Sequence, residues 1–365
     1  MLKYLKRYSE QFSSNLFSAN KLRFLILFVT SQCNCRCSTC FYWQRLNTGD
    51  NLSLEEIKKT SLSIGSLHTL LLSGGEPFLR KELLEICRIF IEQNKISILA
   101  VPTNGTLTGQ ILEFSEEVLR TYPKITLSIA VSLDGFKETH DSIRGMPGAF
   151  DKAVATLRGL AQIKQRYANL ESGINTVITR NTLPELKSFM DMVYNDLPID
   201  FQDFELLRGQ YKDKNLELPS LDEIKLIHRA ILKNRERYLV KAKSGKIESV
   251  AVISLLKFVN SIKERILSGK KTAFACSAGK NIGVIDANGE VRLCELKPPI
   301  GNLRDNNYDL PALLNSPFAL AMKKDIRKNK CGCTHVCFIK LTVSHHLKTL
   351  WYLFSNYLTY SIKHE

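Results

Sequence analysis

The chain has 365 residues, of which 44% are hydrophobic and 24% are charged. This composition excludes a collagen, a coiled coil and a wholly disordered chain, and the length predicts about two domains. Lysine and arginine outnumber aspartate and glutamate by 51 to 36, which gives a formal net charge of +15. That charge favours an anionic partner without identifying it.

Short apolar runs alternate with longer helical patterns through the first two thirds of the chain, which is typical of repeated βα units around a parallel sheet. Right-handed crossovers would curl such units into a partial barrel. The expected strands are Leu22–Val29, Thr69–Leu72, Ile96–Val101, Ile125–Val131, Gly173–Ile178 and Phe201–Leu206. The expected helices include Leu54–Ile64, Lys81–Gln93, Thr108–Arg120, Phe150–Tyr167 and Pro184–Asn195.

The last third of the chain has a different pattern. The segment from Leu221 to Leu267 is helical and basic, and we expect it to connect two modules. Ile282–Ile285 and Val291–Leu293 predict a β-hairpin, in which the dipeptide Asn288-Gly289 supplies the positive φ angles. Near the end, Leu347 to Tyr360 has apolar residues at helical spacing. We expect this amphipathic helix to dock on the core, with a membrane-surface helix as the alternative.

Ten cysteines fall into two dense groups that lie far apart in the chain, with few between them. A small disulfide framework would spread its pairs through a short sequence, so the pattern favours metal ligation in a reducing, cytoplasmic compartment. The cysteines are at positions 33, 35, 37, 40, 87, 276, 294, 331, 333 and 337.

The first group contains Cys33-x3-Cys37-x2-Cys40 in the loop after the first expected strand. Three thiolates on one loop can hold three irons of a cubane cluster and leave the fourth open. By itself the spacing is also compatible with zinc. The stretch from Ser31 to Phe41 resembles the radical S-adenosylmethionine superfamily in its cysteine spacing and in the aromatic residue after the last cysteine.

Further motifs follow the next strands in the order that this family shows. Alone, each would usually be a turn or a surface charge. Together they lie just past the carboxyl ends of the strands, where α/β barrels place their active sites. They are Ser73-Gly74-Gly75-Glu76-Pro77, Thr103-Asn104-Gly105-Thr106, Ser132-Leu133-Asp134-Gly135 and His140-Asp141-Ser142-Ile143-Arg144-Gly145.

The resemblance implies a role for each motif. Gly74, Gly75 and Glu76 would bind the amino group of the methionine moiety of S-adenosylmethionine. Ser132 and Arg144 would contact its ribose or carboxylate, and Asn104 and Asp134 would belong to the same site. Cys33, Cys37 and Cys40 would hold the [4Fe–4S] cluster. We expect Cys35 to be a bystander, and Cys87 to be a small buried hydrophobe.

The second group begins at Cys276 and continues with Gly289-x4-Cys294, which resembles the auxiliary-cluster extensions called SPASM and twitch domains. Cys331, Cys333 and Cys337 follow on one loop. Five thiols are thus available where a [4Fe–4S] cluster needs four, and the spacing does not identify the spare one. One auxiliary cluster is expected, with a structural zinc site as the alternative.

The fold class predicted is therefore α/β, a partial (β/α)6 barrel of the radical S-adenosylmethionine type with a small C-terminal auxiliary-cluster domain made of a β-hairpin and helices. The predicted parts are a basic segment (1–21), the barrel (22–210), a helical bridge (211–270), the twitch- or SPASM-like domain (271–340) and an amphipathic helix (341–365).

The resemblance implies an enzyme that cleaves S-adenosylmethionine to a 5′-deoxyadenosyl radical, which abstracts a hydrogen from the substrate. An auxiliary cluster that accepts an electron would make the reaction oxidative, and a peptide or protein side chain is the favoured substrate. Glu205, near the end of the sixth strand, is a weak candidate for the proton acceptor. The expected electron donor is a protein of the flavodoxin or ferredoxin type.

Other readings stay open. Only about twenty residues precede the first strand, so no leader-binding domain is expected there. A separate protein would then present the peptide, or the substrate is a small molecule such as a sugar, aminocyclitol or nucleotide. A lipid or cell-envelope precursor is a further alternative, with peripheral membrane contact. A metal-stabilised nucleic-acid-binding protein is least favoured, because no basic-aromatic binding module is present.

Overall fold

The computed structural model describes residues 21–272, 274–329, 331–344, 349, 351–353 and 355. The basic segment before residue 21 and most of the expected C-terminal helix lie outside the described residues. The chain divides into two compact units, and their order does not follow the sequence. The barrel unit comprises 22–218 and 278–323, and the helical unit comprises the described parts of 219–277 and 324–365.

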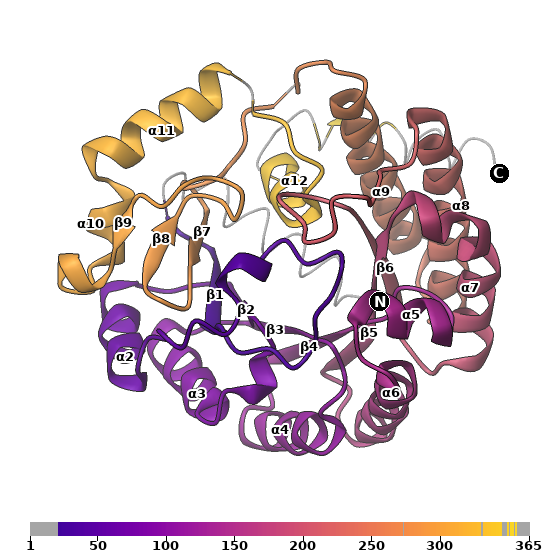
Figure 1. The fold of residues 1–365 in the computed structure, drawn as a ribbon, viewed down its shortest axis with the longest axis horizontal. Coiled ribbons are helices and arrows are strands. Elements are labelled where there is room, and N and C mark those ends of the chain that lie inside the picture. Colours follow the sequence, from indigo (N-terminus) through magenta and orange to yellow (C-terminus); the bar gives the residue numbers. More distant parts are fainter. Residues whose placement is uncertain are drawn as a thin grey trace. The chain divides into compact units, whose positions relative to one another are not determined.

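The barrel unit confirms the predicted α/β fold. Six parallel strands pair with their sequence neighbours in order, and helices connect them on the outside of the curved sheet (Figure 1). The strands are β1 (Phe24–Thr30), β2 (Thr69–Gly74), β3 (Ile98–Thr103), β4 (Thr126–Ser132), β5 (Leu170–Ile178) and β6 (Phe201–Leu206). The helices are α2 (Leu54–Ser63), α3 (Leu83–Asn94), α4 (Thr108–Thr121), α5 (Lys137–Arg144), α6 (Ala149–Arg166) and α7 (Leu183–Asp196).

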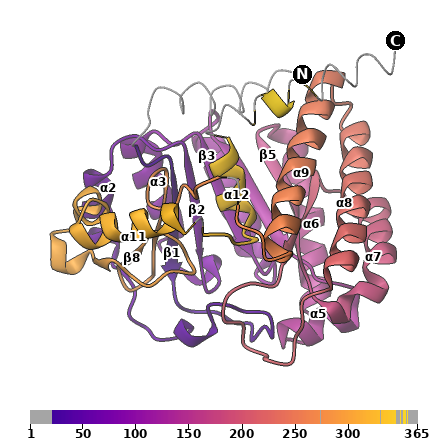
Figure 2. The ribbon, with the colours of Figure 1, turned by 90° about the horizontal axis from the view of Figure 1, so that it is seen from above.

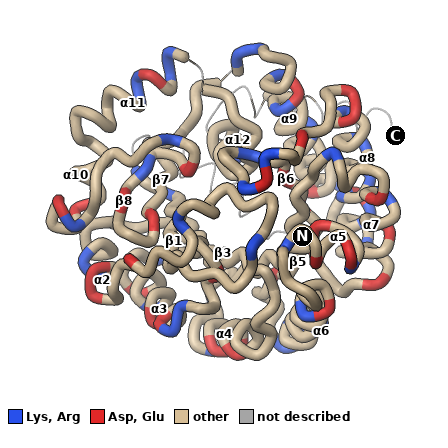
Figure 3. Tube along the Cα trace, viewed as in Figure 1, with Lys and Arg blue, Asp and Glu red and all other residues tan. Residues whose placement is uncertain are grey.

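Hydrophobic burial explains why these segments form strands. β1 to β4 contain no charged residue, as expected for parallel strands that are covered on both faces. Charged residues lie mainly on the surrounding helices and loops (Figure 3). The strands pair in parallel and run alongside one another when seen from above (Figure 2), so their carboxyl ends meet at one end of the unit. Helix α5 has only eight residues and is mostly polar, and it was not among the predicted helices.

The predicted β-hairpin forms, but it joins the barrel sheet. β7 (Ile282–Ile285) pairs in parallel with β1, from Phe24 opposite Ile282 to Leu27 opposite Ile285. β8 (Glu290–Arg292) and β9 (Gly301–Asn302) continue the sheet in antiparallel pairing. All four β7 residues are buried, and β7 covers an edge of β1 that would otherwise lack backbone partners. In the turn only Gly289 has a positive φ (+86°), not Asn288 as predicted.

Two further helices follow the hairpin. The short helix α10 (Leu310–Leu314) begins at Asp309, whose side chain accepts a hydrogen bond from the backbone of Ala312. Helix α11 (Pro317–Lys328) runs across the boundary between the two units.

The helical unit contains α8 (Leu221–Lys241), α9 (Lys246–Leu267) and α12 (Val336–Val343). The helical stretch predicted from Leu221 to Leu267 is therefore two helices, and Ser220 begins the first with a capping box that includes Glu223. Helix α12 packs on α9 through a small apolar core. That core consists of Leu255, Val259, Ile262, Phe274, Ile339 and Val343. Among the helices described, none is both long enough and apolar enough to cross a membrane.

Candidate functional site

The site is built on the loop that follows β1, which holds four of the ten cysteines. The Cys35 side chain is buried, with 2% of the residue exposed, and its sulfur lies 3.7 Å from Met146 Sδ. Cys33, Cys37 and Cys40 are all partly exposed. Cys35, the expected bystander, is thus more deeply buried than the three predicted cluster ligands. Cys87 is fully buried on α3, as expected.

The backbone at the end of β2 packs directly against the backbone at the start of this cysteine loop. A Cβ atom on Gly75 would lie 2.0 Å from the carbonyl oxygen of Gln32, and one on Gly74 would lie 2.3 Å from that of Thr30. Gly74 also has a φ of +124°, which side chains rarely adopt. The close approach permits two backbone hydrogen bonds, from Gly75 N to Thr30 O (2.8 Å) and from Glu76 N to Gln32 O (2.7 Å).

Glu76 connects the end of β2 to the end of β3. Its carboxylate is 1% exposed and accepts hydrogen bonds from Thr103 Oγ1 (2.7 Å), Asn104 N (2.8 Å) and Phe78 N (3.3 Å). Burial raises the pKa of Glu76 to about 7, and these hydrogen bonds oppose the shift. The carboxylate therefore organises the chain's own turn after β3, a role that the motif did not reveal.

Asn104 holds the cysteine loop from the side of β3. Its Nδ2 donates to Asn34 Oδ1 at 2.7 Å, and its Oδ1 accepts from the backbone N and the hydroxyl of Thr106. Asn34 Nδ2 in turn donates to Thr106 Oγ1 at 2.9 Å. Asn34 lies between two cysteines, and nothing in the spacing predicted its part in this network.

The C-terminal end of α5 holds the loop from a third side. Arg36 N donates to Arg144 O, and Ser38 N donates to Ile143 O, both at 2.9 Å. These carbonyls belong to the last turn of the helix, whose carbonyl groups have no partners within the helix. Both neighbours of Cys37 are thus fixed by one helix end.

Arg144 and Asp134 form a buried ion pair next to Cys37. Arg144 Nη2 lies 2.6 Å from Asp134 Oδ2, and Nη1 donates to Cys37 Sγ at 3.6 Å. Asp134 Oδ1 accepts from Val177 N at 2.9 Å. A hydrogen bond from Cys35 and the charge of Arg144 lower the pKa of Cys37 to about 6, although burial opposes them. This favours the thiolate, which is the form that binds metal.

The pKa values of the other two thiols, Cys33 and Cys40, are raised instead. Burial is the largest cause that raises the pKa of Cys33 to about 12 and that of Cys40 to about 11. The charge of Cys37 contributes to both shifts, and that of Cys40 contributes to the shift at Cys33, because the three sulfurs lie near one another. No group of three metal-binding side chains converges on a single ion within the described ranges. A [4Fe–4S] cluster spreads its thiolates over separate irons, and three partly exposed thiols on one loop fit that group.

For two further predicted site residues, Ser132 and Glu205, the contacts that the structure describes do not involve the cysteine loop. Ser132 ends β4 opposite Asn175 of β5 and is partly exposed. Glu205 lies on β6, and its carboxylate accepts a hydrogen bond from Arg208 at 3.3 Å. Arg208 also contacts Glu295 at 3.3 Å, and its guanidinium lies over the ring of Phe41, 4.8 Å from the centroid.

A hollow of about 260 Å³ opens beside the cysteine loop, where the segments after β1, β6 and β7 meet. Its wall contains a charged cluster in which Asp286 pairs with Arg45 and, at 2.5 Å, with Arg292. The remaining wall includes the aromatic residues Phe28, Phe41 and Tyr42, the amides Gln44 and Gln210, and the charged residues Glu295 and Lys297. The residue after the last cysteine, Phe41, thus faces a cavity large enough for part of a small substrate.

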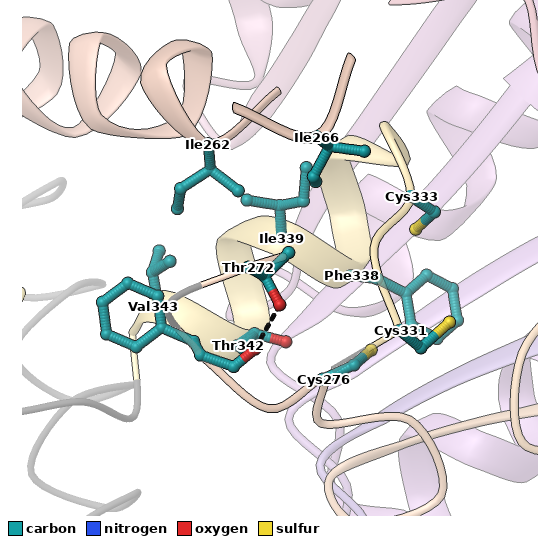
Figure 4. A pocket seen from close by; sticks show the side chains of 11 residues that line it. Ile262, Ile266, Thr272, Cys276, Cys331, Cys333, Phe338, Ile339, Thr342 and Val343 are labelled. Atoms are coloured by element: carbon teal, nitrogen blue, oxygen red, sulfur yellow. Dashed lines mark hydrogen bonds between the residues drawn. The ribbon is translucent and has the colours of Figure 1, made fainter. Parts of the chain in front are cut away.

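The helical unit has its own pocket, which Figure 4 shows from close by. Cys276, Cys331 and Cys333 line it together with apolar side chains such as Ile262 and Phe338. Cys337, on α12, is not among its lining residues. His335 is buried, and its ring packs beside Phe338.

Cys294, the fifth predicted ligand of the auxiliary cluster, belongs to the barrel unit. It follows β8, and its sulfur accepts a hydrogen bond from Leu296 N at 3.4 Å. The structure therefore gathers three of the five predicted auxiliary thiols in one pocket.

Comparison with known proteins agrees with this geometry. Residues 27–193 match the model of the Radical SAM superfamily. The AdoMet-dependent heme synthase of Methanosarcina barkeri is 28% identical, over 86% of this chain and 88% of the synthase. The Fe-coproporphyrin III synthase of the same organism is 31% identical, over 51% of this chain and only 45% of that enzyme. The subtilosin biosynthesis protein AlbA of Bacillus subtilis is 25% identical, over 85% of this chain and 65% of AlbA.

Solved structures share the fold at low sequence identity. The structure of anSMEcpe with bound AdoMet and the Cp18Cys peptide matches with a TM-score of 0.61 at 20% identity, over 94% of this chain and 98% of that one. Streptococcus suis SuiB bound to its precursor peptide SuiA matches with a TM-score of 0.59 at 15% identity, over 93% of this chain and 76% of SuiB. Residues 27–193 of this chain therefore form a Radical SAM domain.

Proposed function

We propose that this enzyme oxidatively modifies a side chain of a peptide or protein. The observation that carries the proposal is the cysteine loop, which presents Cys33, Cys37 and Cys40 and turns Cys35 inward. When bound, the cluster and S-adenosylmethionine supply one-electron cleavage of a carbon–sulfur bond and so the means to remove hydrogen from an unactivated carbon. The chain's own residues hold that group, orient the substrate and exclude water.

We assign the cofactor-binding roles as the motifs suggest. The backbone at Gly74 and Gly75 would accept the amino group of the methionine moiety, with Glu76 fixing the turn beside it. Ser132 and Asn104 would face the cofactor. Glu205 remains a candidate for the proton acceptor. It is a weak one, because its carboxylate already forms an ion pair with Arg208.

Peptide substrates are supported by several relatives. AlbA is named for the biosynthesis of a bacteriocin, and the anaerobic sulfatase-maturating enzyme of Clostridium novyi is 28% identical over 44% of this chain. The anSMEcpe and SuiB structures hold peptides. The hollow beside Phe41 would receive the reacting side chain, since it opens next to the cluster loop.

A tetrapyrrole substrate is the second candidate. The heme synthase relative matches along most of both chains, a longer overlap than the sulfatase-maturating relative offers. We further propose that a protein of the flavodoxin or ferredoxin type donates the electron. A peripheral contact with the membrane is also proposed.

An auxiliary [4Fe–4S] cluster would occupy the pocket of the helical unit. Cys276, Cys331 and Cys333 would supply three thiols, and Cys337 of the same unit would supply the fourth. With four thiolates this cluster would have no open iron, and it would accept an electron from the substrate instead of binding it.

Replacement of Cys37 by alanine should abolish reductive cleavage of S-adenosylmethionine, because the cluster loses a ligand whose thiolate the site favours. Cys35→Ala, two residues away, keeps all three proposed ligand thiols and should retain most of the cleavage, although it removes the hydrogen bond from Cys35 to Cys37. The measurement is 5′-deoxyadenosine formed after anaerobic reconstitution, dithionite and S-adenosylmethionine. Equal cleavage by the two variants would contradict the ligand assignment, and no cleavage by well-reconstituted parent protein would refute the enzyme proposal.

The auxiliary metal can be identified in a variant that lacks Cys33, Cys37 and Cys40. We expect it to keep about four irons per chain after reconstitution, as one [4Fe–4S] cluster requires. Further replacement of Cys276 and Cys331 should remove that iron. Iron and zinc are measured by plasma mass spectrometry, and zinc in place of iron would show a structural zinc site instead.

Candidate substrates can be compared directly. Peptides encoded beside the gene and iron coproporphyrin are incubated with reconstituted enzyme, and each is examined by mass spectrometry. The proposal predicts that a peptide loses a pair of hydrogens, or gains a crosslink with the same loss, while iron coproporphyrin is unchanged. Conversion of the porphyrin with no change in any peptide would favour the tetrapyrrole candidate.

A further inference from the structure

The Arg144 side chain points into the protein toward a cluster ligand. Only 10% of this side chain is exposed. Nη1 lies 3.6 Å from Cys37 Sγ, a distance at which a nitrogen donates a hydrogen bond to the larger sulfur atom. The sequence motif predicted a contact with the ribose or carboxylate of the cofactor, whereas the structure gives the guanidinium two partners within the chain.

The backbone fixes this contact from the same helix end. The amide groups of Arg36 and Ser38, on either side of Cys37, donate to the carbonyls of Arg144 and Ile143. The residue that carries the guanidinium therefore also positions the loop that carries the thiol. These two backbone hydrogen bonds hold Cys37 next to the end of α5 and so fix the distance between Arg144 Nη1 and Cys37 Sγ.

Asp134 fixes the other side of the guanidinium. Its side chain is fully buried, with Oδ2 2.6 Å from Arg144 Nη2 and Oδ1 bonded to Val177 N. A buried carboxylate needs a cation nearby, and a buried guanidinium needs an anion. The pair thus leaves Arg144 little freedom to turn from Cys37 toward another ligand.

We propose that Arg144 is a positioning residue that acts on the cluster through Cys37 and raises its reduction potential. One-electron reduction adds negative charge to the cluster and its thiolates, and no bond forms or breaks. The electron comes from an external low-potential donor. A hydrogen bond and a positive charge at Cys37 Sγ stabilise this added charge, and hydrogen bonds to the sulfurs are among the factors that set such potentials.

The test is a redox titration of the reconstituted enzyme followed by electron paramagnetic resonance. The signal that changes on addition of S-adenosylmethionine identifies the cluster at Cys37. Arg144→Lys keeps the positive charge but loses the planar guanidinium that contacts Asp134 and Cys37 together, so we expect a moderate fall in midpoint potential. Asp134→Asn/Arg144→Met removes the pair without leaving a buried charge, and we expect a larger fall. Arg120→Met is the control, because Arg120 forms a solvent-exposed pair with Glu117 and should leave the potential unchanged.

Iron content and circular dichroism verify that each variant is folded and loaded. An unchanged midpoint potential in the loaded double variant would overturn the proposal. So would weaker binding of S-adenosylmethionine at unchanged potential in Arg144→Lys, since that result would assign Arg144 to the cofactor. Because the potential is read without substrate, this result is independent of the substrate proposed above.

Discussion

The close approach of two backbone segments determines the geometry of this site. The ends of β1 and β2 approach so closely that a single Cβ on Gly75 would overlap the carbonyl oxygen of Gln32. Only glycine permits the two hydrogen bonds that join the segments. The start of the cysteine loop is therefore defined by the edge of the parallel sheet before any metal is bound.

Two further contacts complete the support of this loop. Asn104 holds it through Asn34 from the end of β3, and the last turn of α5 holds both neighbours of Cys37. The first contact uses a side chain just past the end of β3, and the second uses backbone carbonyls at the end of α5. A site built this way is preorganised, because hydrogen bonds to rigid elements hold the loop that carries the proposed ligands.

The sequence predicted the elements better than the contacts between side chains. Alternation of apolar runs located the strands to within a few residues. The partners of Glu76 and Arg144 were not predictable in this way. They depend on residues such as Thr103 and Cys37, which are distant in the chain and meet only after the sheet has formed. The hairpin was predicted as a hairpin, but its pairing with β1 is a long-range contact with no local signal.

The central claim is that the glycine contact between β2 and the cysteine loop is needed to hold the cluster. Its most direct test compares iron content after reconstitution in Gly75→Ala and Gly65→Ala, since a Cβ on Gly65 would meet nothing within 4 Å. Circular dichroism would establish that both variants fold. In a background without Cys276 and Cys331, which removes the proposed auxiliary cluster, Gly75→Ala should lose most of the iron and Gly65→Ala should retain it. Full iron in a folded Gly75→Ala protein would contradict the account.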